Sequence, residues 1–385
     1  MTTASTRPRL AWVDIAKAVS IFFVVSVHAG DWLAFTGVER GPVLEAATTW
    51  GEYFRMPVFF AASGVFAARW LAVGWRELLN RRLATLIWVF LTWQVVMFAY
   101  KYLAALTLPG QRDTSLGAHL LRVVLSPLRP NAELWFLWAL VVFFLVGRLV
   151  HRFDRRWVLG VAAVVSVAWS SWVLVDLAPP GSPLMRAFGA GLQKAPMFLV
   201  FFLAGAYAGP WLLATAARVR WWQAVGAIIV FAAATVAVDR IGLYATPGVS
   251  FAHQVLGLAA GLGAALLLAR IPGVGRGLAA VGRRTLAIYV VHSAVVVVTV
   301  VVLWETGLSG LLVDHGPTAV LVLTALGFLA GLVLHRLAAG TVLLEAPPWF
   351  RPGGRDRATP AERSEPPATP VDVVARPTLP VRSPE

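Results

Sequence analysis

The chain has 385 residues, of which 58% are hydrophobic and only 14% are charged, and its mean hydropathy is +0.73. A soluble domain is nearer half apolar and a quarter charged, so the composition excludes an ordinary soluble enzyme. The net charge of +14 does not indicate nucleic-acid binding, because the arginines lie in short loops between apolar runs. That placement is typical of membrane-topology signals and of contact with anionic membrane lipids.

The apolar runs are long enough to cross a bilayer as helices. A spanning helix needs about 20 residues, whereas a barrel strand needs about 10 in alternating pattern, and the runs here are of the longer kind. The sequence therefore predicts an all-α polytopic membrane protein with about ten transmembrane helices. We expect these spans near residues 12–34, 54–74, 84–106, 132–150, 157–178, 194–214, 221–241, 250–270, 285–304 and 317–338.

The first span, with the stretch DIAKAVSIFFVVSVH, contains three ionisable residues. Charged groups inside a span are costly and often functional. Lys17 and His28 lie three helical turns apart on one face, roughly 16 Å along the axis, and Asp14 is one turn from Lys17, close enough to pair with it. The alternative reading is that Asp14 and Lys17 are interfacial residues and that His28 is a packed polar side chain.

Two later spans contain residues that weaken a helix. The span at 54–74 contains Gly64, and the span at 194–214 contains Pro196 and Gly205. Such residues are tolerated where neighbouring helices satisfy the freed backbone groups, so we expect both spans inside the bundle.

Loop charges predict the orientation of the chain. The loops after the second, fourth, sixth and eighth spans are richer in arginine than the others, although the loop 107–131 is an exception. This bias places both termini in the cytoplasm, with Lys17 near the cytoplasmic interface and His28 deeper, toward the far side. The first span is then expected to act as an uncleaved signal anchor.

The last forty or so residues differ from the rest. The segment 346–385 is rich in proline and charge and has no apolar periodicity, so we expect a disordered cytoplasmic tail. Residues 1–345 form the predicted transmembrane domain, and any chemistry must be performed by this bundle.

Six segments in chain order resemble the membrane acyltransferase 3 family. They are RLAWVDIAKAVSIFFVVSVH, FRMPVFFAASG, NRRLATLIW, ELWFLWAL, FFLAGAYAG and GRRTLAIYVVH, and the likeness covers residues 8–340. Lys17, where the family more often has arginine, is shared with its sugar O-acetylase-like branch. The Arg-x-x-Arg pattern that many members show after the third-helix loop is missing here, because Arg82 is followed by Leu, Ala and Thr.

The resemblance implies transfer of an acyl group, usually acetyl, from cytoplasmic acyl-CoA to a hydroxyl of a cell-envelope glycan or lipid-linked sugar. It also implies a multi-pass protein of the plasma (inner) membrane. Histidine titrates near neutral pH, so we assign His28 the role of general base or, alternatively, transient acyl carrier. Asp14 is included in the catalytic set as the partner of Lys17 or of another basic group.

The expected donor site is cytoplasmic and basic, because CoA is polyanionic. Lys17, Arg81 and Arg82 fit it by side and charge, although the two arginines also fit a plain topology signal. Glu133 and Trp135 could line an acceptor pocket, and Tyr289 and His292 match the family pattern one helical turn apart. Trp135 could equally be an interfacial anchor, and His292 a packed histidine. No His pair with metal-ligand spacing is found, so no metal is expected.

Two other functions fit the same residues. A transporter or flippase also uses intramembrane ionisable residues and broken helices, but the sequence lacks a repeat relating its two halves. A non-catalytic anchor for partners of the proline-rich tail would not need His28.

Overall fold

The structure is a computed structural model that describes residues 11–110, 115–130, 133–171, 182–243 and 246–351. These ranges are helical and contain no strand, as the composition predicts. The remaining residues, including 352–385 of the predicted tail, lie outside the described ranges. The helices are α1 (Ala11–Ala34), α2 (Pro42–Ala72), α3 (Trp75–Leu78), α4 (Ala84–Thr107), α5 (Leu116–Val124), α6 (Trp135–Val150), α7 (Arg155–Ala168), α8 (Pro183–Tyr207), α9 (Gly209–Arg218), α10 (Trp221–Ile241), α11 (Val249–Ala269), α12 (Val274–Gly282), α13 (Thr285–Glu305) and α14 (Gly316–Ala338), with a π-helical turn at Leu79–Leu83 and 3₁₀ turns at Leu308–His315 and Pro348–Phe350.

Each predicted span overlaps a helix within the described ranges, although residue 132 and residues 172–178 of two spans lie outside these ranges. Not all of these helices are long and apolar enough to cross a bilayer by themselves. Within the described ranges six helices meet both requirements, or seven if one bent pair is a single span. Helix α6 is apolar but has only 16 residues. The protein is therefore a multi-pass membrane protein, with fewer clear spans than the predicted ten.

The predicted span 194–214 is wrong as a continuous helix. Helix α8 ends at Tyr207, and α9 leaves it at an angle of 79°. Pro210 occupies the first turn of α9, where its missing N–H and its ring cannot continue the preceding helix. The apolar composition continues through this bend, which is why the sequence alone suggested one span.

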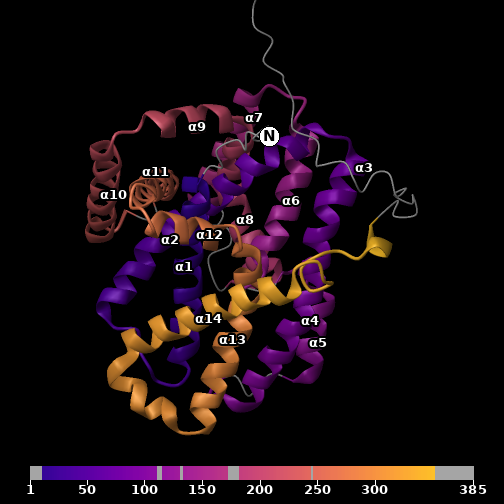
Figure 1. Ribbon diagram of the computed structural model, residues 1–385, viewed down its shortest axis with the longest axis vertical. Coiled ribbons are helices and arrows are strands. Elements are labelled where there is room, and N and C mark those ends of the chain that lie inside the picture. The colour runs from indigo at the N-terminus through magenta and orange to yellow at the C-terminus, as the bar shows by residue number, and fades with distance from the viewer. Residues whose placement is uncertain (1–10, 111–114, 131–132, 172–181, 244–245, 352–385) are drawn as a thin grey trace, which may run out of the picture.

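Helix α1 lies at the centre of the bundle. It packs against α2, α11, α12, α13 and α14, and most of its residues are buried. In Figure 1, α10 and α11 lie side by side at one flank, α4 and α6 lie at the other, and α1 and α2 run between them. Asp14, Lys17 and His28 therefore lie among neighbouring helices, whereas Asp31, near the end of α1, is exposed.

Glycines set the distance between α2 and α8. A Cβ on Gly64 would overlap the backbone carbonyl of Phe202, and one on Gly205 would overlap the carbonyl of Ala61. The two backbones meet at these glycines, which is the close small-residue packing common in membrane bundles. The prediction that Gly64 and Gly205 lie inside the bundle is confirmed.

The segment after α14 returns to the surface of α4. The indole nitrogens of Trp88 and Trp93 donate to the carbonyls of Val342 and Leu343, at 2.6 and 2.9 Å. The ring of Trp88 also meets the rings of the 3₁₀ turn Pro348–Phe350. The first residues of the predicted tail, 346–351, thus lie against the bundle.

Candidate active site

Two cavities of similar size open inside the bundle. The first, of about 450 Å³, is lined by Val24, Val27, His28, Glu52, Tyr53, Arg55, Met56, Phe59, Glu133, Trp135, Phe136, Gln193, Lys194, Met197, Phe198, Ser250, Gln254 and Tyr289. The second, of about 460 Å³, is lined by Asp14, Lys17, Phe59, Ser63, Phe66, Arg69, Trp70, Arg82, Leu86, Phe136, Leu137, Leu140, Arg283, Thr285, Leu286 and Tyr289. We call them the His28 cavity and the arginine cavity.

Helix α1 contributes to both cavities. Lys17, near its start, lines the arginine cavity, and His28, near its end, lines the His28 cavity. The helix is continuous between them, so the shared helical face predicted from their spacing is what the fold uses. Asp14 lies with Lys17 and not with His28, and its carboxylate is 2.8 Å from the Lys17 ammonium.

Three aromatic side chains separate the two cavities. Phe59, Phe136 and Tyr289 line both, and each is only 6% exposed. Phe136 makes edge-to-face contacts with the other two, with ring centroids 4.8 Å from Phe59 and 5.5 Å from Tyr289. The Tyr289 hydroxyl donates to the backbone carbonyl of Glu133, which fixes this ring in place. We call these three residues the aromatic layer.

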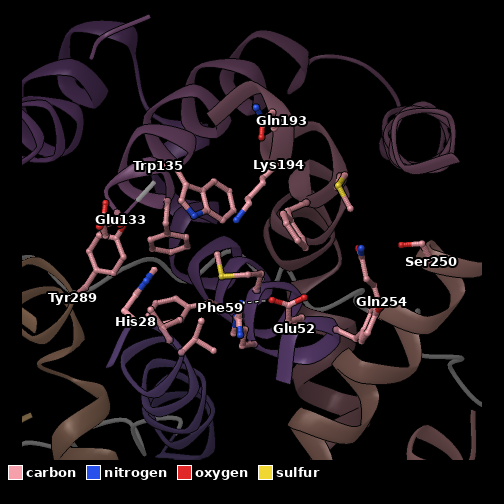
Figure 2. Close-up of a pocket in the computed structure, with 18 residues that line it drawn as sticks. His28, Glu52, Phe59, Glu133, Trp135, Gln193, Lys194, Ser250, Gln254 and Tyr289 are labelled. Carbon is pink, nitrogen blue, oxygen red and sulfur yellow. Dashed lines mark hydrogen bonds and ion pairs between the residues drawn. The ribbon is translucent and has the colours of Figure 1, made fainter. Parts of the chain in front are cut away.

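His28 points into its cavity with its ring available to a ligand. Among the described residues, none makes a hydrogen bond to the His28 imidazole. The nearest ring is that of His292, whose centroid lies 5.4 Å away. In Figure 2, His28 lies beside Tyr289 at one side of the cavity, and Lys194 reaches in next to Trp135. If the His28 ring lay against lipid with no cavity beside it, a catalytic role would be excluded. In the structure the ring instead lines a cavity.

His292 lies behind His28 and lines neither cavity. It is fully buried, and its Nδ1 is 2.7 Å from the carbonyl of Tyr289 and 3.2 Å from that of Ile288. Its Nε2 is 3.1 Å from the Ser293 hydroxyl. These contacts are those of a packed histidine that supports the back of the His28 ring, rather than of a substrate-binding group.

The arginine cavity has a large surplus of positive charge. Lys17 is neutralised by Asp14, but within the described part of the chain Arg69, Arg82 and Arg283 have no carboxylate within ion-pair distance. The Nε of Arg82 is buried and has no hydrogen-bond partner. Helix α13 also begins at the cavity, with Thr285, and a helix N-terminus favours anions. The cavity thus carries three arginines that the carboxylates of the described residues leave unneutralised.

The π-helical turn Leu79–Leu83 separates the two predicted donor arginines. Arg82 turns inward, and its guanidinium lies over the Phe144 ring at 5.4 Å. Arg81 points outward, with its side chain 73% exposed and 3.7 Å from Glu77. Arg82 therefore lines the predicted donor site and Arg81 does not. The two side chains leave the same turn in different directions, and of the two Arg82 alone lines the cavity.

The predicted acceptor residues Glu133 and Trp135 do line the His28 cavity, at the start of α6. The Glu133 carboxylate is 2.8 Å from the ammonium of Lys101. Trp135 is only 7% exposed, so it is not a lipid-facing anchor. Tyr289 belongs to the aromatic layer and touches both cavities.

Several charged residues of the cavities were not expected from the sequence. Arg69, Arg283, Arg55 and Lys194 lie in the short loops or at the ends of the predicted spans, where a cation is typical of a topology signal. Lys194 could have been found, because it begins an apolar run in which a charge is costly. In the described ranges no cluster of three His, Asp or Glu residues is placed to hold a metal ion.

Comparison with known proteins gives one match. A family model described as an acyltransferase domain, of the acyltransferase 3 type, matches residues 10–336. No curated protein and no solved structure matches this chain.

Proposed function

The chain belongs to the acyltransferase 3 family and is a membrane acyltransferase, and from that premise we propose that it transfers an acyl group, acetyl in the simplest case, from acyl-CoA to a hydroxyl of a cell-envelope glycan or lipid-linked sugar. The proposal places the arginine cavity on the cytoplasmic side of the plasma (inner) membrane, with both termini. The His28 cavity then faces the acceptor on the other side.

The observation that supports this proposal best is the arrangement of the two cavities. A cationic cavity and a histidine cavity meet back to back, with only the aromatic layer between them. A donor with a polyanionic nucleotide and a long neutral arm ending in a thioester suits such a pair. The nucleotide is attracted by the arginines, and the arm is directed along α1 toward His28.

In the arginine cavity, the roles follow from charge and position. Arg82 and Lys17 are the predicted donor residues that line it, and Arg69 and Arg283 extend the cationic surface. Arginine guanidinium groups bind phosphate oxygens in bidentate fashion, whereas Lys17 acts as a single charge. Asp14 holds the Lys17 ammonium at 2.8 Å and so is proposed as a positioning residue.

In the His28 cavity, the imidazole is proposed to accept the proton of the acceptor hydroxyl. The hydroxyl oxygen then forms the new ester bond to the acyl carbon, the thioester C–S bond breaks, and the thiolate of CoA takes up the proton. In the alternative, the imidazole nitrogen itself attacks the thioester, the C–S bond breaks and CoA leaves as its thiolate. The hydroxyl oxygen then forms the ester bond to the acyl carbon, the N–C bond to the imidazole breaks, and the thiolate takes up the hydroxyl proton. Both routes use His28, and both need the aromatic layer to admit the donor arm.

The transporter interpretation is less favoured. The family match is to an acyltransferase domain. The two cavities also differ in charge, whereas a transported substrate would need similar binding groups in both.

The test uses the full chain purified in detergent or nanodiscs. Release of free CoA from acetyl-CoA is measured with and without a mixture of envelope glycans, and the glycans are then analysed by mass for added acetyl groups. We expect acceptor-dependent CoA release and a matching mass increase. Transport of an unmodified sugar lipid into vesicles, with no CoA release, would contradict the proposal.

A further inference from the structure

Resting on the proposed function, we propose that the acceptor carries an anionic group, a carboxylate or a phosphate, and that Lys194 binds it inside the His28 cavity. The inference concerns the chemical class of the acceptor, which the family match leaves open.

The charges of the His28 cavity leave Lys194 unmatched. Both carboxylates that line the cavity already have a cation, since Glu52 is 3.1 Å from Arg55 and Glu133 is 2.8 Å from Lys101. Among the described residues, Lys194 has no carboxylate within ion-pair distance. Its ammonium lies over the face of the Trp135 ring, 5.7 Å from the ring centroid.

The Lys194 side chain is exposed to the open space of the cavity, so a ligand there can reach its ammonium. In Figure 2, Lys194 extends into the cavity beside Trp135, on the side where His28 also points inward. A ligand anion that occupies the cavity would form a charge-assisted hydrogen bond with this ammonium, which no carboxylate of the described residues engages.

Gln254 provides a second, independent sign of a ligand. It lines the same cavity from α11, is 3% exposed, and its Oε1 has no hydrogen-bond partner. A buried amide oxygen without a donor is unfavourable, and a sugar hydroxyl could donate to it. Trp135 and Tyr53 add aromatic surface on which a sugar ring can lie. The cavity thus combines hydroxyl, ring and anion contacts.

The anion could belong to two kinds of acceptor, namely a sugar carboxylate as in a uronic acid or the phosphate of a lipid-linked sugar. Three probes separate them: glucose, glucuronate and glucose 1-phosphate, each added at equal concentration to the purified full chain. The shift in melting temperature reports binding without any donor. Acetyl transfer from acetyl-CoA to each probe reports use as an acceptor.

We expect one or both anionic probes to bind at least about tenfold more tightly than glucose, the scale of one charge-assisted hydrogen bond. Lys194→Gln should abolish the difference, and Lys194→Arg should restore much of it. Arg156→Gln, which removes a positive charge from an exposed site outside both cavities, is the matched control and should keep the difference.

The outcomes distinguish this inference from the function on which it rests. Acetyl transfer to all three probes with equal efficiency would support the acyltransferase and overturn the anionic acceptor. An anion preference that survives Lys194→Gln would overturn the role of Lys194. Stabilisation by succinate but by neither anionic sugar would place the anion on the acyl group and would overturn the assignment to the acceptor. Anion binding that depends on Lys194, with no acyl transfer at all, would support the site and contradict the proposed function.

Discussion

The two cavities are nearly equal in size but differ in how far the carboxylates near them neutralise the cations of their walls. In the arginine cavity one carboxylate, Asp14, faces four cations, so a strong positive field remains. In the His28 cavity each carboxylate is paired, and only Lys194 is left over. The difference fits the proposal that the first cavity attracts a polyanion by its overall field, whereas the second binds a ligand with a single anionic group through individual contacts.

This division agrees with the chemistry of acyl transfer. The charged groups of the proposed donor lie far from its reacting carbonyl, and the acceptor must bring a hydroxyl close to His28. The aromatic layer keeps the two environments apart, and apolar side chains there limit the water that could hydrolyse a thioester. The predictions below test each part of this contrast in turn.

The largest effect should come from His28. His28→Ala removes the imidazole that lines the His28 cavity and that is proposed to accept the hydroxyl proton. Acyl transfer should therefore fall by at least about 100-fold. The measurement is the rate of acceptor-dependent CoA release by purified protein. His315→Ala, at an exposed histidine outside both cavities, is the control and should retain normal activity. Equal activity of the two variants would remove His28 from the mechanism.

The second largest effect should come from substitution of Arg82, which can be compared with substitution of Arg81 in the same π-helical turn. Arg82→Gln should raise the KM for acetyl-CoA about 10- to 100-fold, since a buried contact to a charged phosphate is lost. Arg81→Gln makes the same change at the next residue, which points outward and pairs with Glu77. It should change KM by less than about twofold. Similar values for both variants would show that these arginines only set membrane topology.

The packing of α2 on α8 should affect both cavities together, since each helix lines the His28 cavity and α2 reaches the other. Gly64→Ala introduces a Cβ where the backbone of Phe202 lies, so we expect a loss of stability of about 1–3 kcal/mol. The melting temperature and both substrate constants should change. Gly160→Ala, whose Cβ meets nothing within 4 Å, should be neutral or slightly stabilising. A silent Gly64→Ala would mean that the helices are farther apart.

The smallest effect should come from loosening the aromatic layer. Phe59→Leu frees space between the cavities, so longer acyl groups should pass more easily. We expect the kcat/KM ratio of butyryl-CoA to acetyl-CoA to rise about fourfold for each added CH₂. Phe22→Leu, at an exposed position on α1 outside both cavities, is the control. An unchanged ratio would show that Phe59 does not limit the acyl group.

The comparison also shows why some site residues could be predicted and others could not. Lys17 and His28 belong to one helix, and its periodicity fixes their common face whatever the rest of the chain does. Arg69 and Arg283 come from α2 and from the segment before α13, and only the packing of these elements on α1 brings them beside Lys17. Their sequence surroundings are those of ordinary loop arginines.

Orientation around a helix is a second limit. The sequence grouped Arg81 with Arg82, but the packing of the π-helical turn Leu79–Leu83 on the bundle decides that Arg82 faces the cavity and that Arg81 is exposed. In the same way, Tyr289 and His292 share a helix and a family pattern, yet Tyr289 reaches both cavities and His292 reaches neither.

By itself, the sequence determined the class of this protein and most of its helices, and six motifs in chain order indicated its family. The class and the helices follow from local composition and periodicity, because a bilayer admits helices only where about 20 apolar residues run together. The tertiary structure decided that there are two cavities rather than one, which cations share a cavity with Asp14, and that a layer of aromatic rings separates them from His28. These are relations between helices distant in the chain, and close packing at glycines such as Gly64 and Gly205 sets them in space.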